Sequence, residues 1–569
     1  MGPEQIAGPF ELASSQLGAL PLIDHFLARM DLRPALGRCL PAGDARTSLA
    51  AATVIGVLVR NLCVEREPLY GLAGWAGAFE PGMLGLAPGE SELLNDDRVG
   101  RALDQLFDSD RGSLLTDLVL HAVREFAIDC SQLHNDSTSI ALHGDYSAAD
   151  GRERGGKPTP AAALGHSKDH RPDLKQLVLI LTVTADGAVP LTHRLVAGNT
   201  NDDQTHIHTW DELRALTGRA DFLYVADSKL CTREQMSHVD QAGGRFVTVL
   251  PRTRREDGQL REWMSASAPE LTEAARRPGK RQGDPDQVWR VAPAPFASSE
   301  GHRIVWVHSS VKQDRDETAR HQRIERTRAA LLELNERLAG PRARITTRVA
   351  AEDAAAEILD ASGAERYVSF TITETIEERF RQEKRGRPGK DTRYRKLTRT
   401  RFQLTVEIDA DAIRHDAASD GCFPLITNDH DLTDQEALIA YRYQPNLEKR
   451  HHQLKSVHDA APVTLKSPVR IEALFACQFI ALLACCLIER ELRAAMTRER
   501  IPELPLYPED RSCTAPTATR VFDHLAPLQR HHLIRDGHTV QTFEPQLTPL
   551  QARLLHLLGV PATAYTSSR

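Results

Sequence analysis

The segment from residue 131 to residue 250 alternates between strand and helix patterns, and this order limits what the chain can fold into. Three strand-like segments come first, and helices then alternate with two further strands. In chain order these are the strands Gln132–Leu142, Gln176–Thr184 and Val189–Val196, the helix Asp202–Leu216, the strand Asp221–Ala226, the helix Thr232–Gln241 and the strand Arg245–Leu250. Such an order predicts a mixed α/β sheet.

The rest of the chain is arranged around this sheet. With 569 residues the chain is too long for one compact core, so several domains are expected. We expect a helical region that binds DNA or dimerises, the first half of the core, an insertion with strands of alternating polarity, the second half of the core, and a second helical region. Their bounds are 1–125, 126–250, 251–430, 431–496 and 497–569.

The longest apolar run, Ala473–Ile488, is sixteen residues long. A bilayer-spanning helix needs roughly 18–20 apolar residues, so we expect a buried core helix and no membrane partner. The N-terminal residues MGPEQIAGPFEL contain neither a basic nor an apolar leader segment, so we expect a cytoplasmic protein.

One segment concentrates positive charge in a chain whose formal net charge is -7. Residues 379–401 hold eleven Lys and Arg against two acidic residues, a net charge of +9. They predict a β-hairpin with a basic tip that contacts DNA, and a merely solvated loop is the alternative. Within it, Arg-Gly-Arg-Pro resembles the core of an AT-hook, whose arginines enter a narrow minor groove. The candidate DNA contacts here are Lys384, Arg385, Arg387, Lys390, Arg393, Arg395 and Lys396.

The stretch Tyr441–Lys455 places one carboxylate, Glu448, among cations and a tyrosine. Steps of seven residues keep nearly the same helix face, so Glu448 and Lys455 are expected to point the same way. Pro445 is well tolerated at the start of a helix, so a new helix is expected there, and the alignment of Tyr441 with Glu448 is weaker.

Two more carboxylates would complete a metal site with Glu448. Asp136 lies in the middle of the first predicted strand, and Asp227 lies at the end of the fourth. Carboxylate oxygens are ligands that Mg²⁺ prefers, and a pair of such ions can activate a water or a 3′-hydroxyl of DNA. Each residue alone is better explained as a solvated side chain or a turn former, since the chain has 78 acidic residues. Together, and in this order, they favour a metal site.

Two other groups of polar residues have two interpretations each. The loop Gly165–Gln176 carries Lys168, Arg171 and Lys175, which either reach the metal site or belong to a polar turn. The pair His451-His452 lacks a complete set of zinc ligands and is expected at the surface or facing DNA.

These segments resemble the signatures of bacterial insertion-sequence DDE transposases, in the subclass with a Tyr–Arg–Glu–Lys motif. LHNDSTSIAL is similar to the family's first-Asp strand, GHSKDHRPDLKQLVLILTV to the run that follows it, and LYVADSKL to the second-Asp strand. DGCFPLITND followed by YRYQPNLEKRHHQLKS is similar to the approach to the catalytic Glu. The resemblance covers the chain from Leu133 to the C-terminus.

The resemblance implies an α/β fold with a ribonuclease-H-like core, interrupted by a β-rich insertion domain and flanked by helical terminal regions. Asp136, Asp227 and Glu448 match the metal ligands and would hold two Mg²⁺ or Mn²⁺ ions per active site. Tyr441 and Lys455 match the outer letters of the motif and would contact DNA.

The sequence departs from the family at one position of the motif. Gln444 stands where the family has Arg; it can hydrogen-bond a phosphate but brings no charge. Its neighbours Lys449 and Arg450 either compensate as DNA contacts or are solvated helix residues.

The resemblance also implies cut-and-paste transposition, in which the element's ends are nicked by hydrolysis and their 3′-hydroxyls attack target DNA. The implied partners are double-stranded DNA, as terminal inverted repeats and as target, and a second copy of the chain in a synaptic complex at the bacterial nucleoid. Two alternatives stay open: a DNA-binding protein without catalysis, such as a decayed or domesticated transposase, and another metal-dependent nuclease on the same fold.

Overall fold

The chain forms two compact units in the computed structural model. Met1–Thr248 and Ala440–Arg569 form the first unit, and Val249–Ile439 forms the second. The predicted domain boundaries are finer than these units and stay predictions. The structure describes residues 9–42, 49–279, 281, 283–340, 343–457, 463 and 465–566, with only the backbone of Asp202, Val457 and Asp510.

A mixed sheet forms the centre of the first unit, with the strands in the order β4-β3-β2-β5-β6. Neighbours in β4-β3-β2 are antiparallel, whereas β2 pairs with β5, and β5 with β6, in parallel. The strands are β2 (Gln132–Ala141), β3 (Gln176–Thr184), β4 (Pro190–Ala197), β5 (Leu223–Val225) and β6 (Arg245–Val249). The predicted mixed α/β fold is therefore confirmed.

The two central strands differ in character. Every residue of β3 is buried, which agrees with its mostly apolar sequence, in which Gln176, Thr182 and Thr184 are the polar residues. β2 buries polar side chains instead, among them His134 and Asn135. Buried polar groups need hydrogen-bond partners, and Nδ2 of Asn135 donates to Oγ1 of Thr182 on β3 at 2.9 Å. A polar strand held in an apolar sheet is a suitable place for a chemical site.

Helix α15 (Pro468–Arg498) is the core helix of the first unit. It packs against strand β4 and against the helices α3 (Ala51–Val64), α5 (Asp96–Asp108) and α17 (Pro549–Leu557). By length and composition it would be able to cross a membrane, but 89% of its most apolar part is buried inside the protein. The interpretation as a buried core helix is confirmed.

Further helices belong to the first unit, and two of them, α14 and η6, carry most of the stretch Tyr441–Lys455. The chain enters this segment through α13 (Asp434–Tyr441), and α14 passes directly into a π-helical turn, η6. These helices are α7 (His206–Thr217), α8 (Arg233–Gln241), α14 (Gln444–His452) and η6 (Gln453–Val457).

A second, three-stranded sheet joins segments that are far apart in the sequence. β1 (Glu11–Gln16) pairs antiparallel with β13 (Gln529–Arg535), which pairs with β14 (His538–Phe543). The prediction that 1–125 and 497–569 are helical is therefore incomplete. The sequence of β1, ELASSQ, has no clear alternation of apolar and polar residues, so it gives no strand signal. The other helices of these regions are α1 (Leu20–Arg29), α2 (Leu32–Cys39), α4 (Leu72–Ala78), α6 (Arg111–Glu125) and α16 (Ala518–Leu525).

The second unit contains four antiparallel strands and several helices. Its strands stand in the order β12-β9-β8-β7. The elements are α9 (Arg255–Ser267), β7 (Thr272–Arg277), β8 (Gln287–Pro293), β9 (Arg303–Ser309), α10 (Ser310–Ala339), α11 (Arg348–Ser362), α12 (Ala410–Ala417) and β12 (Cys422–Thr427).

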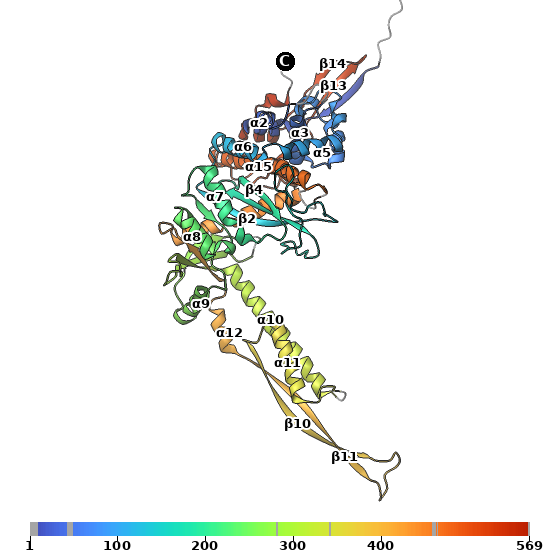
Figure 1. Ribbon diagram of the computed structural model, residues 1–569, viewed down its shortest axis with the longest axis vertical. Coiled ribbons are helices and arrows are strands. Elements are labelled where there is room, and N and C mark those ends of the chain that lie inside the picture. The colour runs from blue at the N-terminus through green and yellow to red at the C-terminus, as the bar shows by residue number, and fades with distance from the viewer. Residues whose placement is uncertain are drawn as a thin grey trace, which may run out of the picture. The chain divides into compact units, whose positions relative to one another are not determined.

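A long two-stranded ribbon completes the second unit. β10 (Val368–Gln382) and β11 (Tyr394–Ile408) pair antiparallel over all fifteen residues of each strand. The ribbon runs beside α10 and α11 and continues beyond them (Figure 1). Its base packs on these helices through a buried cluster that includes Ile372, Phe402 and Leu404. The predicted β-hairpin is confirmed.

Candidate active site

Asp136 lies in the middle of β2 and is half-buried. Its Oδ1 atom is 3.3 Å from Nζ of Lys168, and its Oδ2 atom is 3.9 Å from Nδ1 of His451. The same ammonium donates a 2.6 Å hydrogen bond to the main-chain oxygen of Ser137. The carboxylate therefore faces nitrogen-bearing side chains from two other parts of the chain.

Asp227 follows β5, and its side chain accepts a hydrogen bond from the N–H of Lys229 at 3.0 Å. β5 pairs in parallel with β2, and Val225 stands opposite His134. Asp227 and Asp136 each lie two residues further along their strands. The register therefore brings the two predicted carboxylates to the same level of the sheet.

Tyr441, the last residue of α13, has all three predicted carboxylates as electrostatic neighbours. Burial raises the pKa of its phenol to about 12, and the negative charges of Asp227, Glu448 and Asp136 contribute to the increase. Such charge effects weaken with distance. The carboxylates of two strands and of helix α14 thus lie around one phenol.

Lys455 lies in the π-helical turn η6. Its Nζ is 2.7 Å from Oδ1 of Asp169 and 3.3 Å from Oγ1 of Thr138. Thr138 follows Asp136 by two residues on β2 and so shares its face of the sheet. The wider π turn interrupts the seven-residue step from Glu448, so these two contacts, and not a shared helix face, hold Lys455 at the site.

The dipeptide Lys168-Asp169 joins the two sides of the site. Lys168 pairs with Asp136 of the sheet, and Asp169 pairs with Lys455 of the helical segment. The loop after β2 therefore reaches the site, in agreement with one of its two interpretations.

The other two basic residues of this loop pair locally. Nη2 of Arg171 is 2.7 Å from Oδ2 of Asp173, and Nζ of Lys175 is 3.8 Å from Oδ1 of Asp145. Arg171 is exposed and Lys175 is half-exposed, and their contact with DNA stays a prediction.

Arg450 corrects the sequence interpretation, because it lies in the core and not on a DNA-facing surface. Its Nη1 atom is 2.5 Å from Oε2 of Glu489 on α15. The guanidinium also donates to the carbonyl oxygens of Ala188 at 3.0 Å and Gly187 at 2.8 Å. Arg450 thus links α14 to α15 and to the β3–β4 turn by an ion pair and hydrogen bonds. Its guanidinium is buried in these contacts and is not placed to bind a phosphate.

Gln444 corrects the sequence interpretation in the same way. It is buried, its Oε1 atom is 3.1 Å from Nδ1 of His134, and its Nε2 donates to the main-chain oxygen of Asn135 at 3.2 Å. The side chain therefore holds α14 against β2, just before Asp136. Lys449, by contrast, is exposed, and its predicted contact with DNA stays a prediction.

Two buried histidines lie next to the aspartates; the sequence analysis missed His206 and misplaced His451. Nε2 of His206 is 3.9 Å from Oδ1 of Asp227, and His451 lies at the same distance from Asp136. The expectation that His451 is at the surface is wrong. Burial lowers the pKa of His451 to about 4, against an opposing effect of Asp136. Its position four residues after Leu447, on the apolar face of α14, was the available signal.

The carboxylate oxygens of the three predicted ligands suit a hard cation, but they are not close enough together to coordinate one ion in this structure. Asp136, Asp227 and Glu448 offer only carboxylate oxygens, the ligand type that Mg²⁺ and Mn²⁺ prefer. Within the described ranges, no group of three or more His, Cys, Asp or Glu side chains is close enough to hold a metal ion. The residues therefore fit Mg²⁺ by their chemistry, as separate donors around Tyr441.

A polar hollow of about 280 Å³ opens next to Lys168. Its walls include Thr138 of β2, the ammonium of Lys229 and the amides of Asn199 and Asn201. Ammonium, amide and hydroxyl donors are the groups that contact DNA phosphates.

The basic residues predicted at the tip of the β10–β11 ribbon are all exposed. They are Lys384, Arg385, Arg387, Lys390, Arg393, Arg395 and Lys396. Lys396 also pairs with Glu378 across the ribbon at 2.5 Å. Their exposure makes them available to DNA, and the contact itself stays a prediction.

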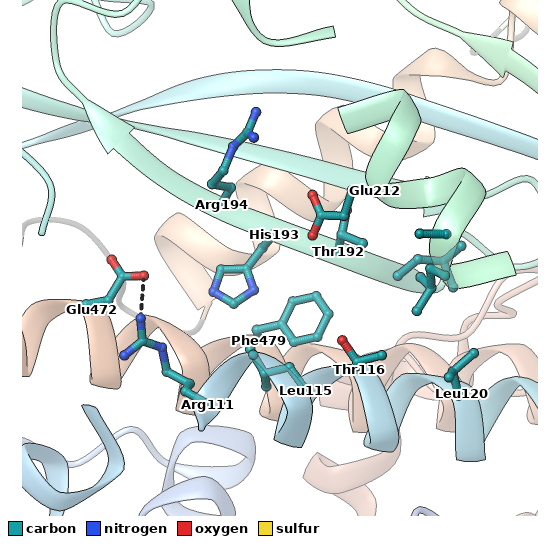
Figure 2. A pocket seen from close by; sticks show the side chains of 14 residues that line it. Arg111, Leu115, Thr116, Leu120, Thr192, His193, Arg194, Glu212, Glu472 and Phe479 are labelled. Atoms are coloured by element: carbon teal, nitrogen blue, oxygen red, sulfur yellow. Dashed lines mark hydrogen bonds and ion pairs between the residues drawn. The ribbon is translucent and has the colours of Figure 1, made fainter. Parts of the chain in front are cut away.

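A cavity of about 430 Å³ lies elsewhere in the first unit, between α6, β4, α7 and α15. Figure 2 shows His193 beside Phe479 and the ion pair between Arg111 and Glu472, whose atoms are 3.1 Å apart. Of the described residues that line it, none is a predicted carboxylate ligand. The cavity is therefore separate from the candidate site.

One family model matches the N-terminal part of the chain. Residues 12–120, from β1 through most of α6, match the family model described as "Domain of unknown function (DUF4277)". No curated protein matches the chain. Among solved structures, the cryo-EM structure of a piggyBac transposase synaptic complex with hairpin DNA is similar at a TM-score of 0.23 and 9% identity, over 51% of this chain and 59% of that chain. The chain thus spans less than two thirds of that transposase, and a TM-score of this size assigns neither a fold nor a function.

Proposed function

We propose that the protein is a metal-dependent DNA transposase of the DDE type, with a ribonuclease-H-like core. One observation carries this proposal: Asp136, Asp227 and Glu448 all lie around the phenol of Tyr441. These carboxylates are 91 and 221 residues apart in sequence, so local structure does not explain their meeting. Such a set of carboxylates can support phosphodiester hydrolysis and strand transfer.

The three carboxylates would hold one or two Mg²⁺ or Mn²⁺ ions. Bound there, the metal would supply an activated water or 3′-hydroxyl and stabilise the leaving oxygen. Lys168 pairs with Asp136 at 3.3 Å, so this ion pair would have to open for a cation to bind Asp136.

The remaining site residues would orient the DNA backbone. Lys455 and Lys168 place ammonium groups at the face of the sheet that carries Asp136. Tyr441, whose pKa is about 12, keeps its proton at neutral pH and can donate a hydrogen bond to a phosphate oxygen. The polar hollow beside Lys168 extends this set of donors along the strand.

The substrates would be the terminal inverted repeats of the protein's own element and a target duplex. Hydrolytic nicking at the element's ends would expose 3′-hydroxyls, which would then attack the target. Pairing of two ends requires at least two copies of the chain, so we propose a homodimer on DNA in the bacterial cytoplasm.

The deciding experiment measures strand cleavage of a duplex that carries the inverted repeats flanking the protein's gene. We expect Mg²⁺-dependent cuts at the element boundary with 3′-hydroxyl ends. EDTA should abolish them, and so should Glu448→Gln, which keeps the shape of the side chain but removes its charge. Glu503→Gln, at an exposed position of the same unit, is the matched control and should cut normally.

Two results would contradict the proposal. Binding of the inverted repeats without cleavage under any divalent metal would remove the catalytic role. Cleavage by Glu448→Gln at the rate of the unchanged protein would show that the third carboxylate lies elsewhere.

A second function, DNA binding without catalysis, is favoured by one observation. Two candidate site lysines are engaged with carboxylates, Lys168 with Asp136 and Lys455 with Asp169. Titration of Mn²⁺ into the protein by calorimetry separates the two functions, because a pure binding protein has no need of a cation at these carboxylates.

A further inference from the structure

One face of the β10–β11 ribbon carries apolar side chains among charged and polar ones, which include Glu374, Glu378, Gln382 and Lys396, and its base is covered. Ile372, Phe402 and Leu404 lie on this face and are buried against α10 and α11. Side chains of a strand alternate between faces, so the same face continues outward with every second residue. Beyond the helices it carries Ile376, Phe380 and Tyr394, which we call the apolar stripe.

The apolar stripe is strongly exposed. The three side chains are 69%, 66% and 50% exposed, respectively. Phe380 stands opposite Lys396, and Tyr394 is two residues from Lys396, so the two aromatic rings are diagonal neighbours. A two-stranded ribbon is at best marginally stable alone, and exposed apolar side chains on one face mark a binding surface.

Charge identifies the partner that fits this surface. The segment 379–401, which contains two of the three stripe residues, has a net charge of +9, from eleven Lys and Arg against two acidic residues. Two ribbons packed stripe to stripe would bring two such charges together. Duplex DNA instead offers one negative charge per roughly 1.7 Å of helix axis, so charge complementarity favours DNA over a second copy.

The dimensions of the ribbon agree with a DNA groove. The major groove is about 12 Å wide and admits a two-stranded β-ribbon, whose strands are about 4.8 Å apart. At about 3.3 Å per residue, the part from Ile376 to Gln382 is roughly 20 Å long, or about six base pairs. An apolar side chain in this groove can contact the methyl group of thymine.

We propose that the apolar stripe binds in the major groove of duplex DNA and contacts base edges, while basic residues of the tip and of the opposite face bind the flanking phosphates. Arg379, Arg381 and Arg395 lie on that opposite face, since they alternate with the stripe residues. The ribbon thus reads DNA with one face and neutralises it with the other. This inference rests on the DNA partner of the proposed function but not on catalysis.

The test measures equilibrium binding to a duplex with the inverted repeat, in EDTA, across a range of salt concentrations. The double variant Phe380→Ala with Tyr394→Ala should weaken binding by roughly tenfold or more at every salt concentration, because buried apolar area is lost. It should leave the slope of log affinity against log salt unchanged. Arg387→Gln should instead reduce the magnitude of that slope by about 0.9, the value for one phosphate contact.

Two controls separate contact from folding and one groove from the other. Tyr70→Ala removes an exposed aromatic side chain from the first unit and should leave binding unchanged. Thermal unfolding of the double variant should match that of the unchanged protein, because the buried base of the ribbon is kept. Dimethyl sulfate footprinting should show protection of guanine N7, a major-groove atom, which the double variant loses.

Several outcomes would overturn the inference. Unchanged affinity of the double variant would show that the stripe does not touch DNA. Disruption of a DNA-free dimer by the same variant, seen by sedimentation, would assign the stripe to a second copy. If the double variant binds normally while Glu448→Gln abolishes cleavage, the proposed function stands and this inference falls. If the unchanged protein binds no duplex at all, both fall.

Discussion

Arg450 provides a prediction that separates the structural account from a purely sequence-based one. In its sequence context, LEKRHH, it is either a DNA contact or a solvated helix residue, and both interpretations place it at the surface. In the structure it is only 6% exposed and pairs with Glu489, which is 2% exposed. We therefore predict that Arg450→Met destabilises the first unit strongly, whereas Lys449→Met, one residue earlier and exposed, does not.

The magnitude follows from what remains after the substitution. After the substitution, the carboxylate of Glu489 still has two partners. They are the partly exposed guanidinium of Arg493 at 3.4 Å and the main-chain N–H of Ala518 at 3.1 Å. The carbonyls of Ala188 and Gly187 lose their donor altogether. Removal of one partner of a buried ion pair costs about 3–5 kcal/mol of unfolding free energy.

That free energy corresponds to a measurable change in Tm. An unfolding entropy of about 2.1 cal/mol/K per residue, applied to the about 380 residues of the first unit, gives about 0.8 kcal/mol/K. The Tm of this unit should therefore fall by about 4–6 °C in Arg450→Met, measured by scanning calorimetry. Lys449→Met should stay within about 1 °C.

A DNA-binding measurement tests whether Arg450 contacts a DNA phosphate. At a temperature where both variants are folded, the salt dependence of DNA binding should be unchanged by Arg450→Met, because the guanidinium is not placed to meet a phosphate. The reasoning would be refuted if Arg450→Met kept a normal Tm and reduced the slope of log affinity against log salt by the value of about one phosphate contact.

Further expectations concern the candidate site. Lys168→Ala should tighten Mn²⁺ binding by roughly fivefold in calorimetry, because an ammonium 3.3 Å from Asp136 competes with the cation; weaker binding would contradict this. Tyr441→Phe should slow cleavage by roughly tenfold at every pH from 6 to 10, since a phenol with a pKa of about 12 does not ionise in that range; a variant that alters the shape of the pH profile would argue for a titrating phenol. Gln444→Arg, which restores the family motif, should lower stability by about 1–3 kcal/mol in urea unfolding, because it buries a charge where an amide is bonded at both ends; an equally stable and more active variant would show that the site has room for the family's residue. Burial lowers the pKa of His134 to about 4, below its ordinary value near 6.5, so the unfolded chain binds the proton more readily. Its contribution to stability should be complete above pH 6.5 and decrease by up to about 3 kcal/mol as the pH falls to 4, and a His134→Asn variant should show a flatter pH dependence in that interval.

The sequence predicted the elements whose signals are local. The mostly apolar strand β3 is nine residues long and buried throughout, and the aspartates within β2 and directly after β5 were found from their strands alone. The hairpin was predicted from residues 379–401, and the structure extends its two strands to Val368 and Ile408.

The sequence did not predict contacts that depend on distant partners. Arg450 reads as one of four consecutive basic residues, and only the position of Glu489, 39 residues later on α15, makes it a core residue. The strand β1 has its partner far along the chain, since Ser14 pairs with His531, 517 residues away. The sequence also contains no sign of the π-helical turn that carries Lys455, because a step of seven residues assumes a regular α-helix.

The pairing of β1 with β13 has a consequence for the order in which the protein can assemble during synthesis. Bacterial and other ribosomes add about 5–20 residues per second, so β1 waits roughly half a minute or longer before β13 is made. The second unit is continuous in sequence, from Val249 to Ile439, and all of its strands are available before Glu448 is translated. The segment with the basic ribbon can therefore reach its folded form before the set of three candidate carboxylates is complete. If the ribbon binds DNA as proposed, a truncated chain that ends before β13 would carry it without a closed first unit, and we expect that chain to compete for DNA without cutting it.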